Sequence, residues 1–289
     1  FMVAFGIKAA VFPLFFWLPA SYHTPPPAVS GLFAGLLTKV GVYALIRFFT
    51  LMFGGDTGFT HNLILWIAGL TMAGGVLGAV AQHEMRRILA FHSVSQIGYM
   101  VVGLGLLTPL GLAASVFFIW HHSVVKSALF FVSGMVMRLR GTAELSLSGG
   151  LYTAHLSVAV LFGVPALSLA GLPPFGGFVA KLAVVRASIE RGEWAIMAVA
   201  LGVGLLTVYS MAKIWFEVFW KPSPASESEE ADQEGAYGLS IIAPVAVLAV
   251  LTTGMGFGAE YILSLSLRAA DQLLDPAGYA AAVLGGGGT

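Results

Sequence analysis

The sequence predicts an all-α polytopic membrane protein with about eight transmembrane helices, two of them discontinuous. Of its 289 residues, 58% are hydrophobic and only 10% are charged, and the mean hydropathy is +0.89. One soluble core could not cover so much apolar side chain. Apolar runs long enough to cross a hydrocarbon layer of about 30 Å recur along the chain, so lipid is its expected solvent.

The apolar runs define the expected helices, because each crossing needs roughly 20 apolar residues. Most connections between the runs are short, which makes neighbouring helices antiparallel. Residues 1–258 are therefore expected to form one transmembrane domain. The runs lie near 1–19, 29–52, 62–81, 91–107, 110–137, 156–190, 194–219 and 239–258.

Two stretches depart from this pattern. Residues 221–236 contain the acidic sequence SESEEADQEG, which cannot bury apolar surface, so we expect a flexible linker there. This linker is either a solvated loop or a segment that binds a partner. Residues 259–289 have a mixed composition and end in GGGGT, which predicts a weakly ordered C-terminal tail.

Charge and cysteine content exclude several functions. The formal net charge is zero, so the chain lacks the basic footprint of a nucleic-acid-binding protein. The absence of cysteine rules out thiolate catalysis and cysteine-ligated iron–sulfur clusters within this chain. We therefore expect no cofactor and no nucleic-acid partner.

Four lysines lie well inside apolar runs. At about 2.5 to 3.5 kcal/mol each, they cost roughly 10 kcal/mol in total, comparable to the stability of an ordinary domain. Each could snorkel to an interface or neutralise a hidden carboxylate. Alternatively, removal from water disfavours a charged amine, so a buried lysine can take up and release protons. The four are Lys8, Lys39, Lys126 and Lys181.

Two histidines accompany one of these lysines. His122 and Lys126 are four residues apart, so they share a helix face, and histidine is a natural proton carrier near neutral pH. His121 points elsewhere on the helix and is either a further relay residue or a hydrogen-bonded packing residue. These side chains predict a proton relay.

Helix breaks accompany two of the lysines. One break follows Lys8 and the other precedes Lys181. Proline removes a backbone donor and frees a carbonyl, and non-helical backbone at membrane depth marks ion pathways in transporters. A simple proline kink would explain either break alone. The break residues are Pro13, Pro173, Pro174, Gly176 and Gly177.

Four stretches resemble a known family, the antiporter-like subunits shared by Mrp cation/proton antiporters and respiratory complex I. The resemblance covers residue 1 to about 258 and implies the second half of a fourteen-helix antiporter-like fold with inverted repeats. The stretches are GIKAAVFPLFFWLPASYHTPPPAVSGLFAGLLTKVGVYALIR, RRILAFHSVSQIGYM, HHSVVKSALFF and LPPFGGFVAKL.

The resemblance also implies roles for particular residues along a central hydrophilic axis. Lys8 would be the lysine of the first broken helix and Lys181 that of the second. Lys39, Lys126 and His122 would be central relay residues. Family members usually pair the equivalent of Lys8 with a glutamate on an earlier helix. We expect that glutamate upstream, because the chain begins inside an apolar run and resembles a C-terminal part.

Within the family, the chain is most similar to the D-type components of Mrp antiporters. Lys181 differs from the glutamate typical of one complex I subunit, and the chain ends soon after its last helix, unlike the longer A-type components of Mrp. The implied function is proton translocation in a multisubunit antiporter of the bacterial plasma membrane, which exchanges protons for a monovalent cation such as Na⁺. Its partners would be the other subunits and the lipid bilayer.

Two other functions remain open from the residues. One is a proton-pumping membrane-arm subunit of a quinone oxidoreductase like complex I. The other is a membrane anchor that binds haem through His92 and His122. The cation path has no candidate ligands, because no cluster of acidic or carbonyl groups suited to sodium occurs in the predicted helices.

Overall fold

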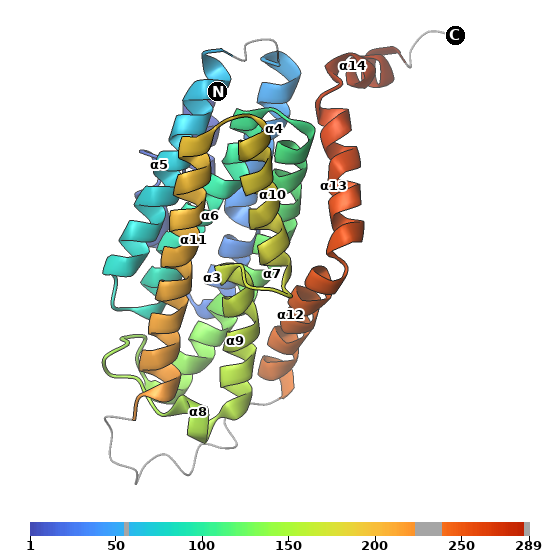
Figure 1. Cartoon of the computed structure of the whole chain (residues 1–289). Helices are drawn as coiled ribbons and strands as arrows, with labels where there is room; N and C mark the ends of the chain where they lie inside the picture. Colours follow the sequence, from blue (N-terminus) through green and yellow to red (C-terminus); the bar gives the residue numbers. More distant parts are fainter. Residues whose placement is uncertain (55–57, 223–238, 286–289) are drawn as a thin grey trace.

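The computed structural model describes residues 1–54, 58–222 and 239–285, in which every regular element is a helix. Figure 1 shows these helices side by side in one elongated bundle. The first elements are α1 (Met2–Ala9), α2 (Trp17–Tyr22), α3 (Pro27–Leu32), the π-helical turn η1 (Phe33–Leu37), α4 (Thr38–Met52), α5 (Thr60–Ala81) and α6 (Met85–Leu106). They are followed by α7 (Pro109–Arg140), α8 (Leu151–Ala154), α9 (Leu156–Ala170), α10 (Gly176–Glu190), α11 (Trp194–Ile214), the π-helical turn η2 (Trp215–Trp220), α12 (Leu239–Phe257), α13 (Ala259–Leu273) and α14 (Pro276–Leu284).

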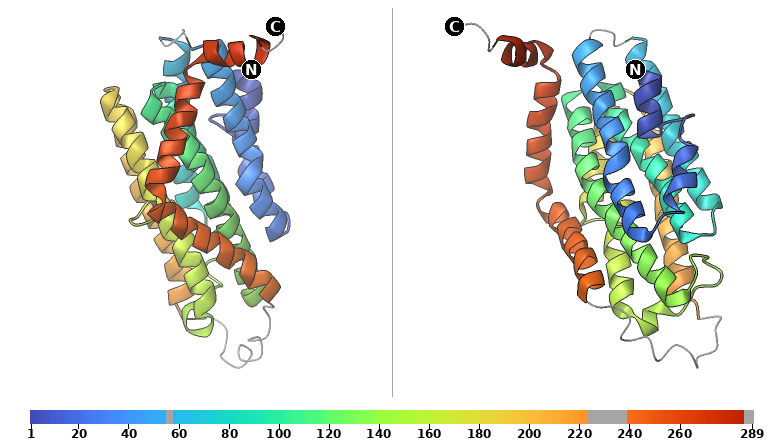
Figure 2. Two further views of the ribbon diagram at one scale, coloured as in Figure 1. Left: turned by 90° about the vertical axis from the view of Figure 1, so that its right-hand side faces the viewer. Right: turned by 180° about the vertical axis from the view of Figure 1, so that it is seen from behind.

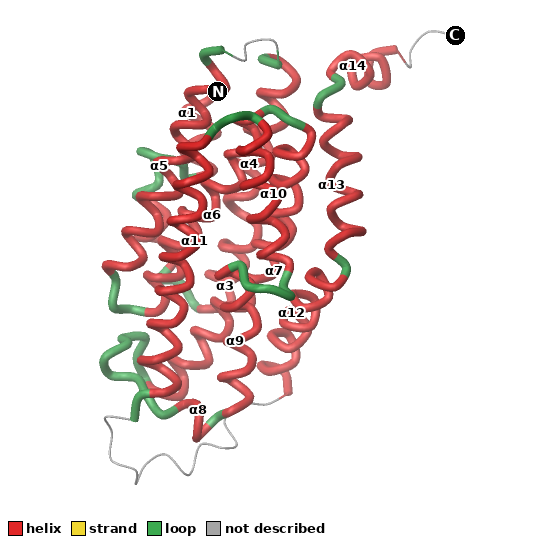
Figure 3. Tube along the Cα trace, viewed as in Figure 1, coloured by secondary structure: helices red, strands yellow, loops and turns green. Residues whose placement is uncertain are grey.

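Six helical stretches of the described residues, not eight, are long and apolar enough to cross a membrane. The two remaining runs are interrupted: residues 1–19 form α1 and α2, and residues 156–190 form α9 and α10. Figure 3 shows the connection between α9 and α10 as a loop in the middle of the bundle. The six are Pro27–Met52, Thr60–Ala81, Met85–Leu106, Pro109–Arg140, Trp194–Trp220 and Ser240–Phe257.

Helix α6 lies at the centre of the bundle. Every residue of α6 except Arg87 and Phe91 is buried. It contacts α2, α4, α5, α7, α10 and α11, so its side chains face protein on all sides. The pair formed with α5 is especially close, since a β-carbon on Gly75 would overlap the backbone nitrogen of Ser95.

The prediction of a weakly ordered tail is wrong for residues 259–285, because they form α13 and α14. Ala259, Ser266 and Ala270 are the buried residues of α13, and this small-residue face packs against α7 and α4. The mixed composition is thus that of an amphipathic helix. The views in Figure 2 place α12 and α13 along one side of the bundle.

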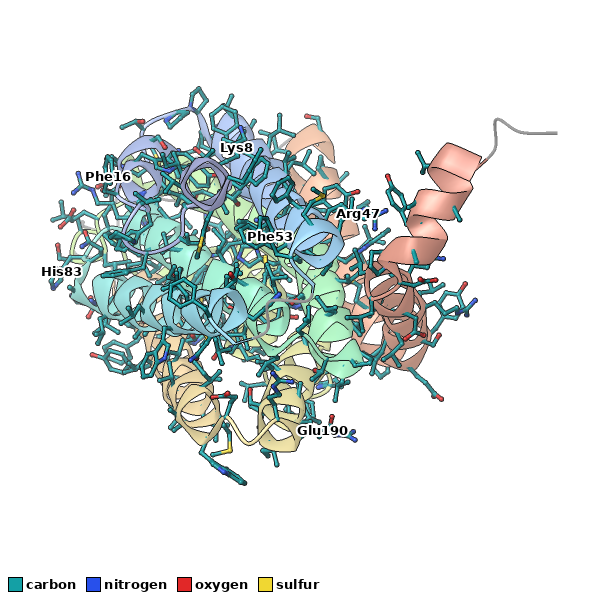
Figure 4. All side chains as sticks on the ribbon, turned by 90° about the horizontal axis from the view of Figure 1, so that it is seen from above. Lys8, Phe16, Arg47, Phe53, His83 and Glu190 are labelled. Carbon is teal, nitrogen blue, oxygen red and sulfur yellow. The ribbon has the colours of Figure 1, made fainter. Side chains whose placement is uncertain are left out.

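An aromatic contact ties α14 to the bundle. The guanidinium carbon of Arg47 on α4 lies 3.7 Å from the ring centroid of Tyr279, a cation–π distance. Figure 4 shows Arg47 on the side that faces this C-terminal segment. The final residues 286–289 and most of the predicted acidic linker, residues 223–236, lie outside the described part of the chain.

The close approach of α5 and α6 predicts the effect of one added methyl group. Gly75→Ala should destabilise the protein by about 1 to 3 kcal/mol, because backbone must move to admit the side chain. The control is Gly202→Ala on α11, where a β-carbon would meet nothing within 4 Å. Thermal unfolding of the purified protein in detergent measures both. Equal midpoints for the two variants would contradict the predicted overlap.

Candidate functional site

Four of the six predicted relay residues lie on α4 and α7, and α6 contacts both of these helices. Lys39 is on α4, Lys126, His121 and His122 are on α7, and α6 adds His92. Each of these five side chains is at most 5% exposed. Charged residues are almost never fully buried unless they are paired, so the groups that hold them decide what the site can do.

Lys126 lies near the middle of the 32-residue helix α7. Its Nζ donates a hydrogen bond of 2.8 Å to the backbone oxygen of Leu89 on α6. The same oxygen accepts a bond of 3.1 Å from Ser93 Oγ. Lys126 has no exposed surface, so its amine does not snorkel to an interface.

Lys39 uses an irregularity in its own helix. The π-helical turn η1 immediately precedes α4, and π turns leave the regular α-helical bonding pattern, often at functional sites. The Nζ of Lys39 donates to the backbone oxygen of Ala34 within this turn. A second buried amine is therefore held by a carbonyl.

The second helix break presents carbonyls in the interior of the bundle. At the end of α9, Gly171 has a φ of 86°. Its N–H donates to Ser168 O at 3.1 Å, and the N–H of Leu172 donates to Leu167 O at 3.1 Å. This pair of bonds is a Schellman cap. It leaves the last two carbonyls of the half-helix free to accept other donors.

Lys181 supplies those donors from α10. Its Nζ lies 3.0 Å from Leu169 O and 2.9 Å from Ala170 O, and it sits 5.4 Å from the ring centroid of Tyr99 on α6. The C-terminus of a helix carries partial negative charge, which stabilises a cation. The predicted association of Lys181 with a helix break is thus a direct contact.

The first break has the same backbone form without the same contact. Helix α1 ends at Ala9, Ala10 has a φ of 63°, and the N–H of Val11 donates to Gly6 O at 3.1 Å. The side chain of Lys8, however, is exposed and makes no hydrogen bond or ion pair with the described residues. Figure 4 places it at the outer edge of the bundle. The structure therefore does not bring Lys8 to the other three lysines.

Carboxylates do not neutralise the inner lysines. Neither Lys39, Lys126 nor Lys181 forms an ion pair within the part of the chain that the structure describes. One explanation that the sequence allowed was a hidden carboxylate beside each buried lysine. The structure instead places backbone carbonyls at the three amines. Such an amine has hydrogen-bond acceptors but no permanent counter-charge.

Repulsion between like charges couples the protonation of six groups, which we call the electrostatic row: Lys39, His92, His121, His122, Lys126 and Lys181. His122 interacts with the charges of Lys39 and Lys126, and also with those of His121 and His92. Lys126 interacts with Lys39 directly. The α4 lysine and the α7 groups thus act on one another.

This coupling also includes Lys181 at the second helix break. His92 interacts with both Lys126 and Lys181, and His121 interacts with Lys181. The predicted residues Lys39, Lys126 and Lys181 therefore lie within one electrostatically connected group. His92 bridges two of these lysines, a role that the sequence did not reveal.

Several buried polar atoms in this region have no hydrogen-bond partner among the residues that the structure describes. They are both ring nitrogens of His92 and His122, Nδ1 of His121, both amide atoms of Gln96 and Oγ of Ser115. More than nine in ten buried polar groups normally have a partner, and internal water is the usual one when protein is not. His92 and Gln96 are four residues apart, so their unpartnered atoms share one face of α6.

No metal site is assigned. Within residues 1–54, 58–222 and 239–285, no three histidine, aspartate or glutamate side chains come together in a way that could hold an ion.

Comparison with known proteins identifies the family. A model described as NADH:quinone oxidoreductase/Mrp antiporter, TM matches residues 1–207. The chain belongs to this family. Two relatives within it are D-type components of Na(+)/H(+) antiporters. That of Alkalihalophilus pseudofirmus is 48% identical over 284 residues, and that of Bacillus subtilis is 38% identical over 283 residues. Each match covers 98% of this chain but only 57% of the relative.

Solved structures of the family share the fold. A chain of the Mrp complex from Dietzia sp. DQ12-45-1b superposes with a TM-score of 0.90 at 38% identity, covering 98% of this chain and 60% of that one. A chain of respiratory complex I from Thermus thermophilus gives a TM-score of 0.80 at 25% identity, covering 94% and 57%. The predicted all-α antiporter-like membrane fold is confirmed, whereas the fourteen-helix count for the whole subunit stays a prediction.

The contact between Gly171 and Lys181 predicts a selective effect. A β-carbon on Gly171 would lie 2.8 Å from Lys181 Cδ, whereas one on Gly192 would meet nothing within 4 Å, although Gly192 also has a positive φ of 75°. Alanine at either position costs about 1 to 2 kcal/mol of backbone strain. Gly171→Ala should cost about 2 kcal/mol more, because it displaces a charged donor from its acceptors. Thermal unfolding of both variants tests this, and equal losses would refute it.

Proposed function

We propose that this chain is the proton-translocating part of a D-type component in a multisubunit Na⁺/H⁺ antiporter of the bacterial plasma membrane. The names and similarity of the relatives support this assignment, as does the likeness to a chain of an Mrp complex. The partners of the chain would be the other subunits of an Mrp-type complex. The transported ions would be protons and a monovalent cation, and the helices would be embedded in the lipid bilayer.

The observation that carries this proposal is the bonding of the inner amines to carbonyls. A protonated amine and a neutral amine can both donate a hydrogen bond to a carbonyl. Loss of the proton therefore leaves the bond to Leu89, Leu169 or Ala170 in place. A lysine paired with a buried carboxylate would instead lose its ionic partner on deprotonation. Carbonyl acceptors make proton exchange less costly at these positions.

Proton movement would follow the electrostatic row. Protons would pass between Lys39 and Lys181 through the α7 pair Lys126 and His122, then through His92 or His121. Neighbouring cations disfavour one another, so protonation of one group promotes release from the next. Buried polar atoms such as those of Gln96 suit water molecules that bridge gaps between carriers.

Lys8 would connect this row to the remainder of the antiporter. It is exposed here at the first helix break, and the chain spans 57% of the curated relatives that it matches. A glutamate on a preceding helix would supply its partner, as the family resemblance implies. The Na⁺ path would lie outside the described helices, in which no three acidic or histidine side chains come together.

Alanine variants test the relay. Lys8→Ala, Lys39→Ala and Lys181→Ala should each abolish Na⁺/H⁺ exchange in everted vesicles without preventing assembly of the complex. The control is Lys213→Ala, because Lys213 Nζ also donates to carbonyls, those of Val80 and Gln82 at 3.2 and 2.7 Å, but lies outside the row. Normal exchange by Lys39→Ala or Lys181→Ala would overturn the proposal. Exchange without any electron donor would argue against a role in an oxidoreductase.

Replacement by arginine separates proton transfer from charge. Arginine retains the positive charge but does not deprotonate in proteins. Lys39→Arg should therefore assemble yet lower exchange at least about a hundredfold, the range that one proton-transfer group contributes. The rate of sodium-dependent pH change in vesicles is the measurement. Wild-type exchange by this variant would mean that charge alone suffices at position 39.

A further inference from the structure

One hydroxyl of the bundle bonds to a predicted relay residue. Ser168 Oγ on α9 lies 2.7 Å from His121 Nε2 on α7, and their side chains are 0% and 1% exposed. The other ring nitrogen, Nδ1, is buried and has no partner within the described part of the chain. The histidine thus has one nitrogen held by the serine and one that is left for exchange.

This contact differs from those of comparable hydroxyls. Ser188, Thr207 and Ser210 are buried, and each bonds to the carbonyl four residues earlier in its own helix. Such back-bonding is the ordinary way for a serine or threonine to be satisfied in a helix. Ser168 instead reaches across to an imidazole.

The position of Ser168 links His121 to Lys181. Ser168 lies in the last turn of α9, and the next two carbonyls, of Leu169 and Ala170, accept from Lys181 Nζ. Two proton carriers on different helices therefore bond to three consecutive residues. Both carriers face the negative end of the same half-helix.

Gly177 allows the three helices to meet at this point. A β-carbon on Gly177, at the start of α10, would overlap the backbone oxygen of Ser168 and lie 2.9 Å from His121 Cε1. Only a residue without a side chain fits there without displacement. The predicted break residue thus has a specific task, which is to let α10 approach the contact between α7 and α9.

We propose that Ser168 is a positioning residue that fixes the imidazole of His121 at the C-terminal end of α9. In this position His121 Nδ1 and Lys181 Nζ both exchange protons with water and carriers at that end of the helix. This inference rests on the proposed function. Because Nε2 is committed to the serine, Nδ1 is the exchanging nitrogen, following the rule that the bond to one ring nitrogen sets the role of the other. Ser168 does not carry the proton itself. Without its hydroxyl the ring can turn, and either nitrogen can face the path.

The charged surroundings of this pair are few. His121 faces Lys181 from α10 and His122 from its own helix. Lys181 faces His92 and the Tyr99 ring from α6. Neither α9 nor α12, which also packs against α7 and α10, carries a titratable side chain. Helix α13, which packs against α7, carries titratable groups that are all exposed: Glu260, Tyr261, Arg268 and Asp271. Helix α11, which packs against α10, carries Tyr209, which is exposed, and Lys213, whose amine bonds to Val80 O and Gln82 O. A change in pH dependence is therefore assigned to the pair and to its inner neighbours His92, Tyr99 and His122.

The test compares three variants of the full-length protein in the assembled antiporter. Ser168→Ala should lower exchange about tenfold, the rate equivalent of one hydrogen bond. It should also move the pH profile of exchange toward acid. Loss of the hydrogen bond destabilises the protonated imidazole more than the neutral one, because bonds to charged groups are the stronger ones. Ser168→Thr, which keeps the hydroxyl, should restore both. The control Ser188→Ala removes a buried hydroxyl of α10 that bonds only within its own helix, and it should leave the pH profile unchanged.

The outcomes separate this inference from the proposed function. A wild-type pH profile for Ser168→Ala, in a background where Lys39→Ala and Lys181→Ala are inactive, would overturn the positioning role alone. Equal shifts for Ser168→Ala and Ser188→Ala would also overturn it, because a general packing defect would then explain both. Normal exchange by the lysine variants would instead remove the proposed function.

Discussion

The hydrogen bond from a buried amine to a helix carbonyl is the interaction on which this site depends. An amine in the middle of a lipid-embedded bundle is costly, and the usual remedy is a carboxylate. Here the acceptors are the backbone oxygens of Ala34 and Leu89 for the buried Lys39 and Lys126, and those of Leu169 and Ala170 for the half-buried Lys181. Backbone dipoles stabilise the amine and do not themselves bind or release protons. The protons held at the site are therefore those on its lysines and histidines.

Irregular backbone makes two sets of these carbonyls available. A regular α-helix uses its interior carbonyls within its own ladder, so carbonyls without a ladder partner occur at ends and defects. Leu89 O, inside α6, is instead an acceptor that Lys126 shares with Ser93. A π turn provides one defect beside Lys39, and the end of α9 provides the other beside Lys181. The two broken helices share one form of cap, although Ala10 holds the left-handed position in the first and Gly171 in the second. Backbone irregularity therefore creates much of the polar interior.

Much of this arrangement could be predicted from the sequence, because its signals are local. A lysine inside an apolar run, or a proline pair ahead of two glycines, shows in the residues alone. The role of His92 could not be found that way, since it depends on which helices surround α6. Helix α13 was missed because its buried face consists only of Ala259, Ser266 and Ala270. Such small side chains do not form a recognisable apolar stripe in the sequence, and their burial depends on packing against α7. The total of eight spans was too high, because the two broken runs are divided into helices too short to count as spans, whereas each of the six uninterrupted runs forms one.

The enclosure of α6 by other helices limits how this bundle can work. A helix with neighbours on every side cannot tilt or slide unless the whole assembly moves with it. Alternating access by rocking one rigid bundle against another would have to carry α6 along with its surroundings. Rotation of single imidazole and amine side chains needs no such displacement. The architecture thus favours a fixed position for α6, with rearrangement limited to side chains, protons and water around it.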